Sequence, residues 1–347
     1  MSPNPVTRGS AITGWGRALP ERVVTNEEIS TLFETSDEWI RERSGISERR
    51  VATGPFVDPQ PPFSPPGGVG TTGRLAEAAG RAAMEAAGID PADVGLLILC
   101  TTTPDQLIPA TSAPLSAALG IGGGAMDLNA ACAGFTYGLV TATGMVSAGI
   151  DRVLLIGAET LSRATNWADR TNAFLFGDGA GAVVVEAVPG ESSLLGWDLG
   201  VDGSLQPILY ADLGSGMVMK GQEVFRRAVR ATVESATNSM ERAKVAAADI
   251  ALFVPHQANI RIMRAVAERL GIPDERIASV IDTTGNTSSA SIPLALVDAA
   301  ERGRLADGDL VLLAGFGAGM TWASAVWRWG KDGPTAPEVT APPSPDK

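Results

Sequence analysis

The order of segments repeats between the two halves of this chain, and no other feature limits the possible folds as strongly. Residues 126–157 run from an apolar strand through a turn at Cys132 and a helix to a second apolar strand. Residues 281–315 follow the same order, with Asn286 on the turn. Similar halves predict two βαβ-rich units packed about a pseudo-twofold axis. Under that arrangement the two turns occupy corresponding positions and face one cleft.

Cys132 lies in the stretch Asp127–Phe135, where an apolar run gives way to small residues around a single thiol. The stretch predicts a strand, a tight turn and a buried helix that starts near Gly134. Backbone N–H groups and the dipole at the start of that helix favour the thiolate, which is the nucleophilic form of cysteine. The alternative is a buried and inert core cysteine, the usual state of a free thiol.

Two further polar residues lie on turns that follow apolar segments. His256, the only histidine of the chain, directly follows the apolar strand predicted at 250–254. Asn286 lies in the polar turn 284–291. Alone, a single histidine is more often structural, and such an asparagine would cap a helix. Together with Cys132, however, a thiol, an imidazole and a carboxamide on strand-to-helix turns predict a Cys-His-Asn catalytic site.

Composition excludes several classes of partner. The chain has 27 Lys and Arg against 39 Asp and Glu, a net charge of -12, which argues against nucleic acid or an anionic membrane as the main partner. Two cysteines, Cys100 and Cys132, form no disulfide framework, so a cytoplasmic location is expected. No signal peptide is expected at the N-terminus. Residues 130–150 come closest to a membrane span, but four hydroxyl residues interrupt them, which favours a buried helix.

The chain divides into two predicted halves and a tail. Residues 1–188 form the half with the cysteine, residues 189–330 form the half with His256 and Asn286, and residues 331–347, with five prolines, are expected to be disordered. Residues 54–68 hold six prolines and predict an irregular exposed loop. The other predictions are helices at 27–33, from 37, at 74–87, before 120, at 223–243, 261–270 and 292–302, and strands at 95–100, 151–157, 250–254, 310–314 and 321–327.

Six motifs make the chain resemble a known family. They are Ser36–Ile46 (SDEWIRERSGI), Ala130–Tyr137 (AACAGFTY), Phe176–Ala182 (FGDGAGA), Pro255–Ile262 (PHQANIRI), Gly285–Ser291 (GNTSSAS) and Gly315–Trp322 (GFGAGMTW). In this order they resemble the β-ketoacyl-acyl-carrier-protein synthase III family, the condensing enzymes that start type II fatty acid or aromatic polyketide chains. The resemblance spans nearly the whole chain. It implies an α/β protein with the five-layered αβαβα thiolase fold, assembled as a homodimer, which agrees with the internal repeat.

The resemblance also implies a mechanism. Cys132 takes the acyl group of a primer acyl-CoA, and malonyl-acyl-carrier protein then loses CO₂ to give an enolate that attacks the acyl-cysteine. His256 and Asn286 would stabilise the enolate with N–H groups. The backbone N–H groups of Cys132 and Ala318 would stabilise the oxyanion that forms when the enolate attacks the acyl-cysteine. Phe316 would keep the malonyl carboxylate in a dry pocket. Neither a metal nor a redox cofactor is expected, because the thioester itself supplies the leaving group and the electron sink.

Binding residues carry over by position from the same resemblance. The implied contacts of CoA are Trp39, which would stack on adenine, Arg43, Arg170, Gly221, Gln222, Phe225 and Asn259. Gln222 stands where some relatives have Asn. The implied docking residues for the carrier protein are Arg261, Arg226 and Arg264, which Arg227 and Arg230 would extend; the alternative is a solvated helix face. Ile108 stands where some relatives have a Phe that closes the acyl pocket across the dimer, so a longer or branched primer is expected.

Other functions remain possible from the sequence. A related acyltransferase would pass an acyl group to an alcohol or a sugar in secondary metabolism without forming a carbon–carbon bond, but such enzymes often alter the triad. A non-catalytic partner is disfavoured because all three groups are present. A thiolase would need a second catalytic cysteine, whereas Cys100 lies within a predicted buried strand.

Overall fold

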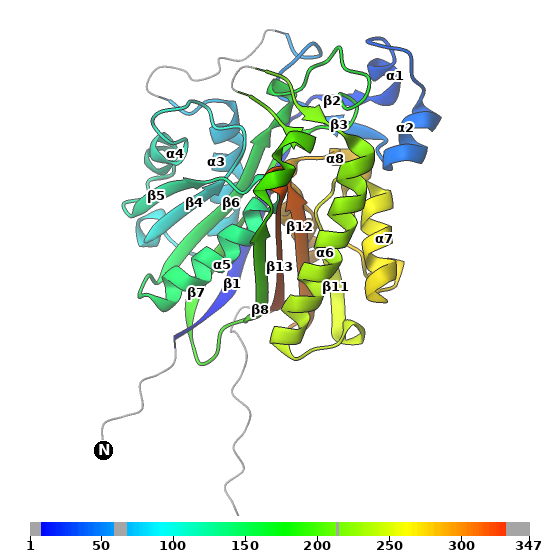
Figure 1. Ribbon diagram of the computed structural model, residues 1–347. Helices are drawn as coiled ribbons and strands as arrows, with labels where there is room; N and C mark the ends of the chain where they lie inside the picture. Colours follow the sequence, from blue (N-terminus) through cyan, green and yellow to red (C-terminus); the bar gives the residue numbers. More distant parts are fainter. Residues whose placement is uncertain (1–7, 59–67, 213–214, 331–347) are drawn as a thin grey trace, which may run out of the picture.

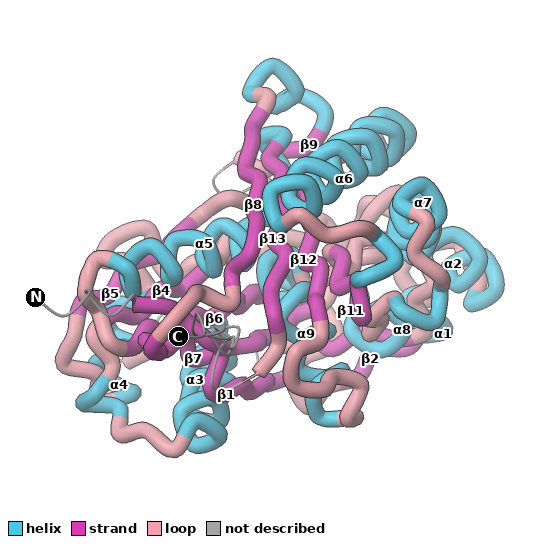
Figure 2. The backbone as a smooth tube through the Cα atoms, turned by 90° about the horizontal axis from the view of Figure 1, so that it is seen from below, coloured by secondary structure: helices cyan, strands magenta, loops and turns pink. Residues whose placement is uncertain are grey.

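Five layers alternate between helices and sheets in the computed structural model, which describes residues 8–58, 68–212 and 215–330. Two helices lie between two β-sheets, and further helices cover the outer face of each sheet (Figures 1 and 2). This is the α/β arrangement of the thiolase fold, as predicted. The outer helices of the first half are α3 (Thr71–Ala87) and α4 (Ser112–Leu119), the central pair is α5 (Gly134–Ser147) and α9 (Ser291–Glu301), and the outer helices of the second half are α6 (Gly221–Ala243) and α7 (Ile260–Leu270).

The first sheet has the strand order β1-β7-β6-β4-β5. β4 runs parallel to both β5 and β6, whereas β7 is antiparallel to β6 and to β1. This order leaves β5 at one edge of the sheet within the described chain. The strands are β1 (Arg8–Ala18), β4 (Leu96–Cys100), β5 (Gly124–Leu128), β6 (Arg152–Thr160) and β7 (Asp178–Pro189).

The second sheet repeats four of these five strands in the same order and direction. β11 is parallel to β12, β12 is antiparallel to β13, and β13 is antiparallel to β8. The counterpart of β5 is not a strand, because residues 277–284 make one isolated bridge, between Ile277 and Phe253, and then the short helix α8 (Ile281–Thr284). The strands are β8 (Leu194–Val201), β11 (Ile250–Pro255), β12 (Leu310–Gly317) and β13 (Thr321–Arg328).

Of the two central helices, α9 is buried on nearly every side, whereas α5 has Gly144 and Ser147 exposed. In α9 all residues from Ser291 to Ala299 are buried, and α5 consists largely of Gly, Ala, Thr, Val and other residues that allow close packing. A helix without a polar face must lie between two apolar surfaces, as these helices do between the sheets. In contrast, α6 has one buried stripe and an opposite face rich in charged residues. The sequence pattern therefore separates inner from outer helices.

The two helices near the N-terminus begin at side-chain caps. The Ser36 hydroxyl accepts the Trp39 backbone N–H at 3.2 Å and starts α2 (Asp37–Ser44), which ends at Gly45 in the left-handed conformation. Thr25 caps α1 (Asn26–Ile29), but α1 is shorter than the predicted helix at 27–33. It stops because the Ser30 and Thr31 hydroxyls bind carbonyls of the preceding turn.

Most other predicted elements are confirmed, and the main additions lie in residues 189–222. There the structure has β8 and a small hairpin of β9 (Leu209–Tyr210) and β10 (Val218–Met219); a second short pair joins β2 (Val23–Thr25) to β3 (Glu48–Arg50). The predicted boundary after residue 188 lies at the end of β7 and stays a prediction. Residues 59–67 of the proline-rich loop and the tail 331–347 lie outside the described residues.

Candidate active site

Three turns from distant parts of the chain meet at one cavity. Cys132 lies in the 3₁₀ turn Ala131–Ala133 between β5 and α5, and His256 directly follows β11. Asn286 lies between α8 and the 3₁₀ turn Ser288–Ala290. All three residues line a cavity of about 1080 Å³. The structure therefore brings together the thiol, the imidazole and the carboxamide that the sequence singled out.

Backbone strain marks two of these turns. Ala131 and Ser288 have φ angles of 47° and 45°, and they are two of the three described non-glycine residues with a positive φ. Left-handed backbone is unfavourable for residues with a Cβ atom and collects at functional sites. Gly317, at the end of β12, packs directly on the cysteine turn, because a Cβ atom there would lie 2.5 Å from the Cys132 backbone nitrogen. The position of the thiol thus depends on close backbone packing.

Asn286 is oriented by its own turn. Its side-chain Oδ1 accepts the Ser288 backbone N–H at 2.9 Å, and its backbone bonds to Leu175 and Gly177 on the opposite segment. Within the described part of the chain, the Nδ2 group makes no hydrogen bond, and Asn286 lines the cavity. The amide is therefore held so that its N–H donors, and not its oxygen, are available to a bound molecule.

His256 is a neutral imidazole. It is 3% exposed, and burial lowers its pKa to about 3. Its Nδ1 lies 2.7 Å from the Ser291 hydroxyl, and its ring packs edge-on against Phe316, with centroids 5.5 Å apart. The second ring nitrogen, Nε2, forms no hydrogen bond to any described residue. That nitrogen is available for contact with a bound molecule.

Burial affects the pKa of the Cys132 thiol. Burial raises the pKa of its thiol to about 12, an effect that a hydrogen bond from Ser288 opposes and the Glu159 carboxylate reinforces. The regular helix α5 begins only at Gly134, two residues further along the chain. Burial therefore opposes the thiolate that the helix dipole is expected to favour, and a resting thiolate stays a prediction.

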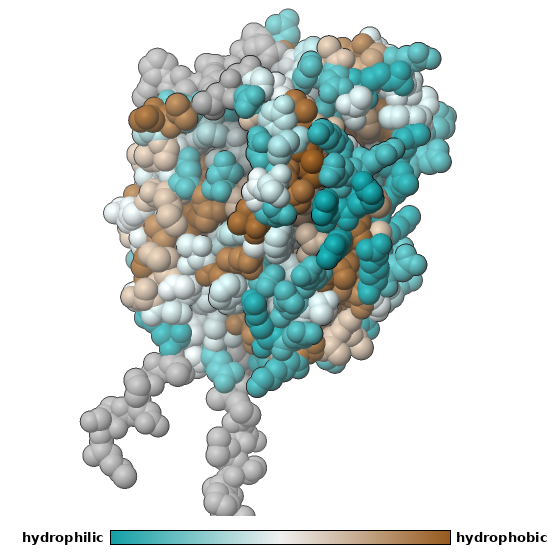
Figure 3. All heavy atoms as spheres, in the orientation of Figure 1, coloured by the Kyte–Doolittle hydropathy of each residue, from teal (hydrophilic) through white to brown (hydrophobic). Residues whose placement is uncertain are grey.

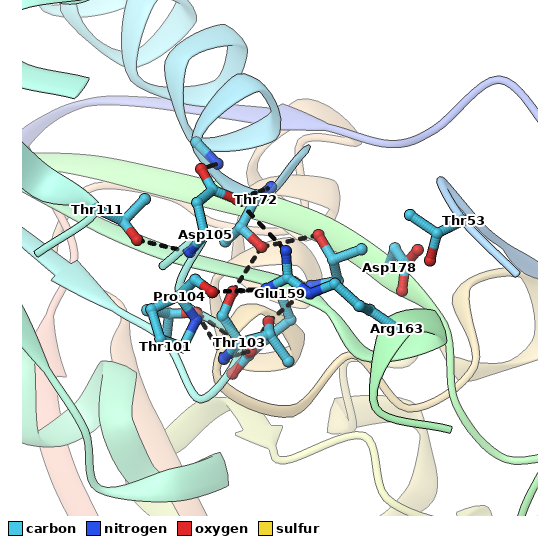
Figure 4. A network of polar contacts seen from close by, with 12 residues as sticks. Thr53, Thr72, Thr101, Thr103, Pro104, Asp105, Thr111, Glu159, Arg163 and Asp178 are labelled. Carbon is cyan, nitrogen blue, oxygen red and sulfur yellow. Dashed lines mark hydrogen bonds and ion pairs between the residues drawn. The ribbon is translucent and has the colours of Figure 1, made fainter. Parts of the chain in front are cut away.

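A buried carboxylate, Glu159, lies within a network of polar contacts (Figure 4). Glu159 is fully buried, and its Oε2 accepts hydrogen bonds from the Thr103 hydroxyl at 2.6 Å and from the Thr102 backbone N–H at 3.1 Å. Its other oxygen accepts the Ser289 hydroxyl at 2.7 Å. Because Thr102 and Thr103 line the cavity and Ser289 belongs to the turn after Asn286, Glu159 ties two parts of the cavity wall together.

The loop that carries these threonines is held from its other side as well. Arg163 donates to the carbonyls of Thr103 and Pro104 at 2.6 and 2.7 Å, as Figure 4 shows. Asp105 accepts the backbone N–H groups of Thr72 and Gly73, which caps α3 from a distant segment. The wall of the cavity is thus built from satisfied buried polar groups.

Most residues predicted to bind CoA line the same cavity. These are Trp39, Arg43, Gly221, Gln222, Phe225 and Asn259. The Arg43 guanidinium lies over the Trp39 ring, 4.7 Å from its centroid, and so covers one face of the ring. Asn259 also has a structural task, since it caps α7 and donates to the Arg43 carbonyl at 2.8 Å. Arg170 is exposed and does not line the cavity, whereas its neighbour Thr171 does.

The residues predicted to dock a carrier protein lie on α6 and α7. Arg226 and Arg261 line the cavity, whereas Arg264 is directed away from it and pairs with Asp274 at 3.2 Å. Arg230 is exposed on α6. The visible surface over α6 and α7 is mainly hydrophilic (Figure 3). Two of these four arginines therefore line the cavity, and the other two lie on the same helices outside its lining.

Of the remaining predicted residues, two lie at the cavity and one does not. Phe316 and Ala318, from the end of β12 and the turn after it, line the cavity beside Cys132. Ile108 does not line the cavity of its own chain. It is 83% exposed, next to Leu107, which is 73% exposed.

Sequence reasoning missed the hydroxyl and carboxyl groups around the triad. Thr102, Thr103 and Ser288 line the cavity, and Glu159 accepts a hydrogen bond from Thr103. One signal was present, because three threonines follow directly after the buried strand β4. Another was the acidic residue inside the apolar strand β6. Both positions lie at the carboxyl ends of parallel strands, where sites usually form.

The described part of the chain lacks two kinds of feature. No helix in this part of the chain is long and apolar enough to cross a membrane. No group of three or more His, Cys, Asp or Glu residues in it is arranged to hold a metal ion.

Known proteins similar to this chain share one description. The family model of 3-oxoacyl-[acyl-carrier-protein] synthase III matches residues 126–203, and the model of its C-terminal part matches residues 240–329. The β-ketoacyl-[acyl-carrier-protein] synthase III 1 of Bacillus cereus is 44% identical over 322 residues, which are 92% of this chain and 99% of that protein.

Solved structures agree with these matches. The crystal structure of 3-oxoacyl-[acyl-carrier-protein] synthase III from Aquifex aeolicus VF5 has a TM-score of 0.85 at 40% identity, covering 92% of this chain and 100% of that one. The priming β-ketosynthase of the R1128 polyketide biosynthetic pathway has a TM-score of 0.84 at 35% identity, covering 94% and 98%.

Proposed function

This chain belongs to the 3-oxoacyl-[acyl-carrier-protein] synthase III family, and from that premise we propose that it starts fatty acid or polyketide chains. The reaction is a decarboxylative Claisen condensation. A primer acyl-CoA and malonyl-acyl-carrier protein are converted to 3-oxoacyl-acyl-carrier protein, CoA and CO₂. The enzyme is thus an acyltransferase. The observation that carries this proposal is the meeting of Cys132, His256 and Asn286 at one cavity.

The first half-reaction acylates the cysteine. The Cys132 sulfur attacks the thioester carbonyl of acyl-CoA, the bond between that carbon and the CoA sulfur breaks, and the thiol proton is transferred to CoA. The tetrahedral oxyanion would accept the backbone N–H groups of Cys132 and Ala318. One such donor typically contributes about 2.7–4 kcal/mol to transition-state stabilisation.

The second half-reaction forms the carbon–carbon bond. The bond between the malonyl carboxylate and its α-carbon breaks, CO₂ leaves, and the electron pair forms an enolate. The N–H groups of His256 and Asn286 would stabilise the negative charge on the enolate oxygen. The α-carbon then attacks the acyl-cysteine carbonyl, the bond from that carbon to the Cys132 sulfur breaks, and the released thiolate takes up a proton from solvent. A neutral imidazole suits this role, because it donates a hydrogen bond without moving a proton.

A two-stage mass experiment tests the proposed function. The full chain is incubated with a panel of acyl-CoAs, and the mass of the intact protein shows whether Cys132 becomes acylated. Malonyl-acyl-carrier protein is then added, and we expect release of CO₂ together with 3-oxoacyl-acyl-carrier protein. Transfer of the acyl group to an alcohol or a sugar without CO₂ release would instead support the acyltransferase alternative.

We also propose that CoA enters past Trp39 and Arg43 and that the carrier protein docks on α6 and α7. The support is that six of the seven predicted CoA residues line the cavity and that Arg226 and Arg261 lie at it. Arg170 lies outside the cavity lining, so its role would be limited to CoA atoms beyond the cavity. On a chain of net charge -12, a local basic surface can still attract an acidic carrier protein.

Charge reversal on α6 tests the docking surface. Arg230 is exposed and does not line the cavity, so Arg230→Glu should leave Cys132 acylation by acyl-CoA unchanged. The KM for malonyl-acyl-carrier protein should rise about 5-fold, equivalent to about 1 kcal/mol. Arg74→Glu is the matched control, because Arg74 is exposed on α3 in the opposite outer layer. Equal KM values for both variants would contradict docking on α6.

A homodimer is proposed from the edge of the first sheet. β5 is the edge strand, and Asp127 on β5 accepts backbone N–H groups of Thr111 and Ser112, which fixes the end of the 101–111 loop beside it. Two large exposed apolar residues, Leu107 and Ile108, lie on that loop. Pairing along β5 would bury them and bring Ile108 to the acyl pocket of the second copy, as the family resemblance implies.

The proposed place of Ile108 predicts the choice of primer. Because Ile is smaller than the Phe of some relatives, kcat/KM should be higher for longer or branched acyl-CoAs than for acetyl-CoA. Ile108→Phe should reverse this order, with a loss of about 10-fold for the longer primers. A strong preference of the unmodified enzyme for acetyl-CoA would contradict the prediction.

Two further proposals concern the location of the protein and its division into halves. The cysteines Cys100 and Cys132 are both free, which supports a cytoplasmic location. The division into two thiolase-like halves after residue 188 is supported by the equivalent strand orders of the two sheets.

A further inference from the structure

The Ser291 hydroxyl lies between two groups behind the catalytic histidine. Ser291 is the first residue of α9 and is fully buried. Its Oγ lies 2.7 Å from Nδ1 of His256 and 3.3 Å from the Gln257 backbone nitrogen. No other described group is within hydrogen-bonding distance of this hydroxyl. Its proton therefore has few possible acceptors.

The number of available protons determines the direction of the two hydrogen bonds at the Ser291 hydroxyl. The Gln257 backbone N–H can only donate, so the Ser291 oxygen accepts from it. The single hydroxyl proton then has one described acceptor, which is Nδ1 of His256. If Nδ1 carried the imidazole proton instead, the buried hydroxyl would have no acceptor, and such an orphaned donor is costly. The arrangement in which Ser291 donates satisfies all three groups.

We propose that Ser291 is a positioning residue that fixes His256 in the tautomer with its proton on Nε2. This inference rests on the proposed function for its purpose, because only that tautomer turns an N–H donor toward the cavity beside the Asn286 amide. The same tautomer cannot act as a base through Nε2. His256 consequently serves the decarboxylation of malonyl thioester and takes no part in deprotonating Cys132.

The unique histidine allows a direct test. His256 is the only histidine of the chain, so the full protein made with ¹⁵N-histidine and purified without a polyhistidine tag gives one imidazole spin system. At neutral pH we expect a protonated, pyrrole-type Nε2 and an unprotonated, pyridine-type Nδ1. A protonated Nδ1 in the unmodified protein would overturn the proposal, whatever reaction the enzyme catalyses.

Ser291→Ala tests the role of the hydroxyl itself. The variant should lose the single-tautomer pattern and give mixed or exchanging signals. Condensation with malonyl-acyl-carrier protein should slow about 10-fold or more, because part of the imidazole no longer presents its donor. Single-turnover acylation of Cys132 should change less than about 3-fold, since that step does not use the Nε2 proton. An unchanged ¹⁵N spectrum, or equal losses in both half-reactions, would contradict the proposal.

Ser239→Ala is the matched control. Ser239 is also a fully buried serine at a helix, but its hydroxyl donates to the Ala236 carbonyl on α6 at 2.9 Å, away from the cavity lining. It should lower thermal stability to a similar extent while leaving the imidazole spectrum unchanged. If Ser291→Ala does not fold, the spectrum of the unmodified protein still decides the tautomer. If condensation is absent from the unmodified protein, the proposed function fails and the spectrum remains a separate result.

Discussion

Replacing Cys132 with alanine should abolish the acyl-enzyme and lower the rate of condensation by at least about 10³-fold. The reason is that no other described nucleophile is available at the cavity in the position of the thiol, which interacts with the Ser288 hydroxyl. Intact-protein mass after incubation with acyl-CoA measures the first effect, and formation of 3-oxoacyl-acyl-carrier protein measures the second. Decarboxylation of malonyl-acyl-carrier protein should persist, because His256 and Asn286 are unchanged.

Cys100→Ala provides the matched control. Cys100 is the other free thiol, but it is fully buried in β4, and burial strongly raises its pKa. Its removal should leave acylation and condensation within about 3-fold of the unmodified enzyme, with a modest loss of stability from the small cavity. If Cys132→Ala still gained the acyl mass, the nucleophile would be a different residue and the proposed mechanism would be wrong.

Local sequence patterns were sufficient to predict most of the fold. Repeated apolar runs located β4, β6, β11 and β12, and the small-residue composition of α5 indicated a buried helix. The errors arise where a residue distant in the sequence determines the local structure. α3 starts at Thr71, before the predicted 74–87, because the Asp105 carboxylate caps it from another segment. The strand expected from the repeat near residue 281 is replaced by α8, which no local pattern predicted.

The candidate site was predictable only in part, for a similar reason. Cys132, His256 and Asn286 stand out because each is a reactive or polar group on a turn after an apolar segment. The burial that raises the pKa of the thiol was not predictable, since it depends on three segments that meet only in the fold. Glu159 and Ser291 were missed because their partners, Thr103 and His256, are 56 and 35 residues away. Hydrogen bonds between residues that are far apart in the sequence can be recognised only once the fold is known.

Asn286→Asp is expected to separate the two half-reactions more sharply than any other single substitution. Aspartate keeps the oxygen that accepts the Ser288 N–H, so the strained turn around Ser288 should be preserved. The Nδ2 donors, however, become a carboxylate oxygen that repels the enolate. Condensation and CO₂ release should fall about 10³-fold, beyond the loss from removing one donor. Acylation of Cys132 should fall less than about 10-fold, which intact-protein mass under single-turnover conditions would measure.

Three comparisons decide between loss of a donor and damage to the turn. Asn286→Ala removes the donor without adding charge, so its loss should be the smaller of the two. Lower pH should partly restore Asn286→Asp, because a protonated carboxyl group can again donate to the enolate. Asn166→Asp is the matched control, since the Asn166 oxygen accepts the Ala168 backbone N–H in an equivalent turn on an exposed loop, and full activity is expected. An Asn286→Asp enzyme that condenses at the unmodified rate would show that the enolate is not stabilised by this amide, and the site would then fit acyl transfer without carbon–carbon bond formation.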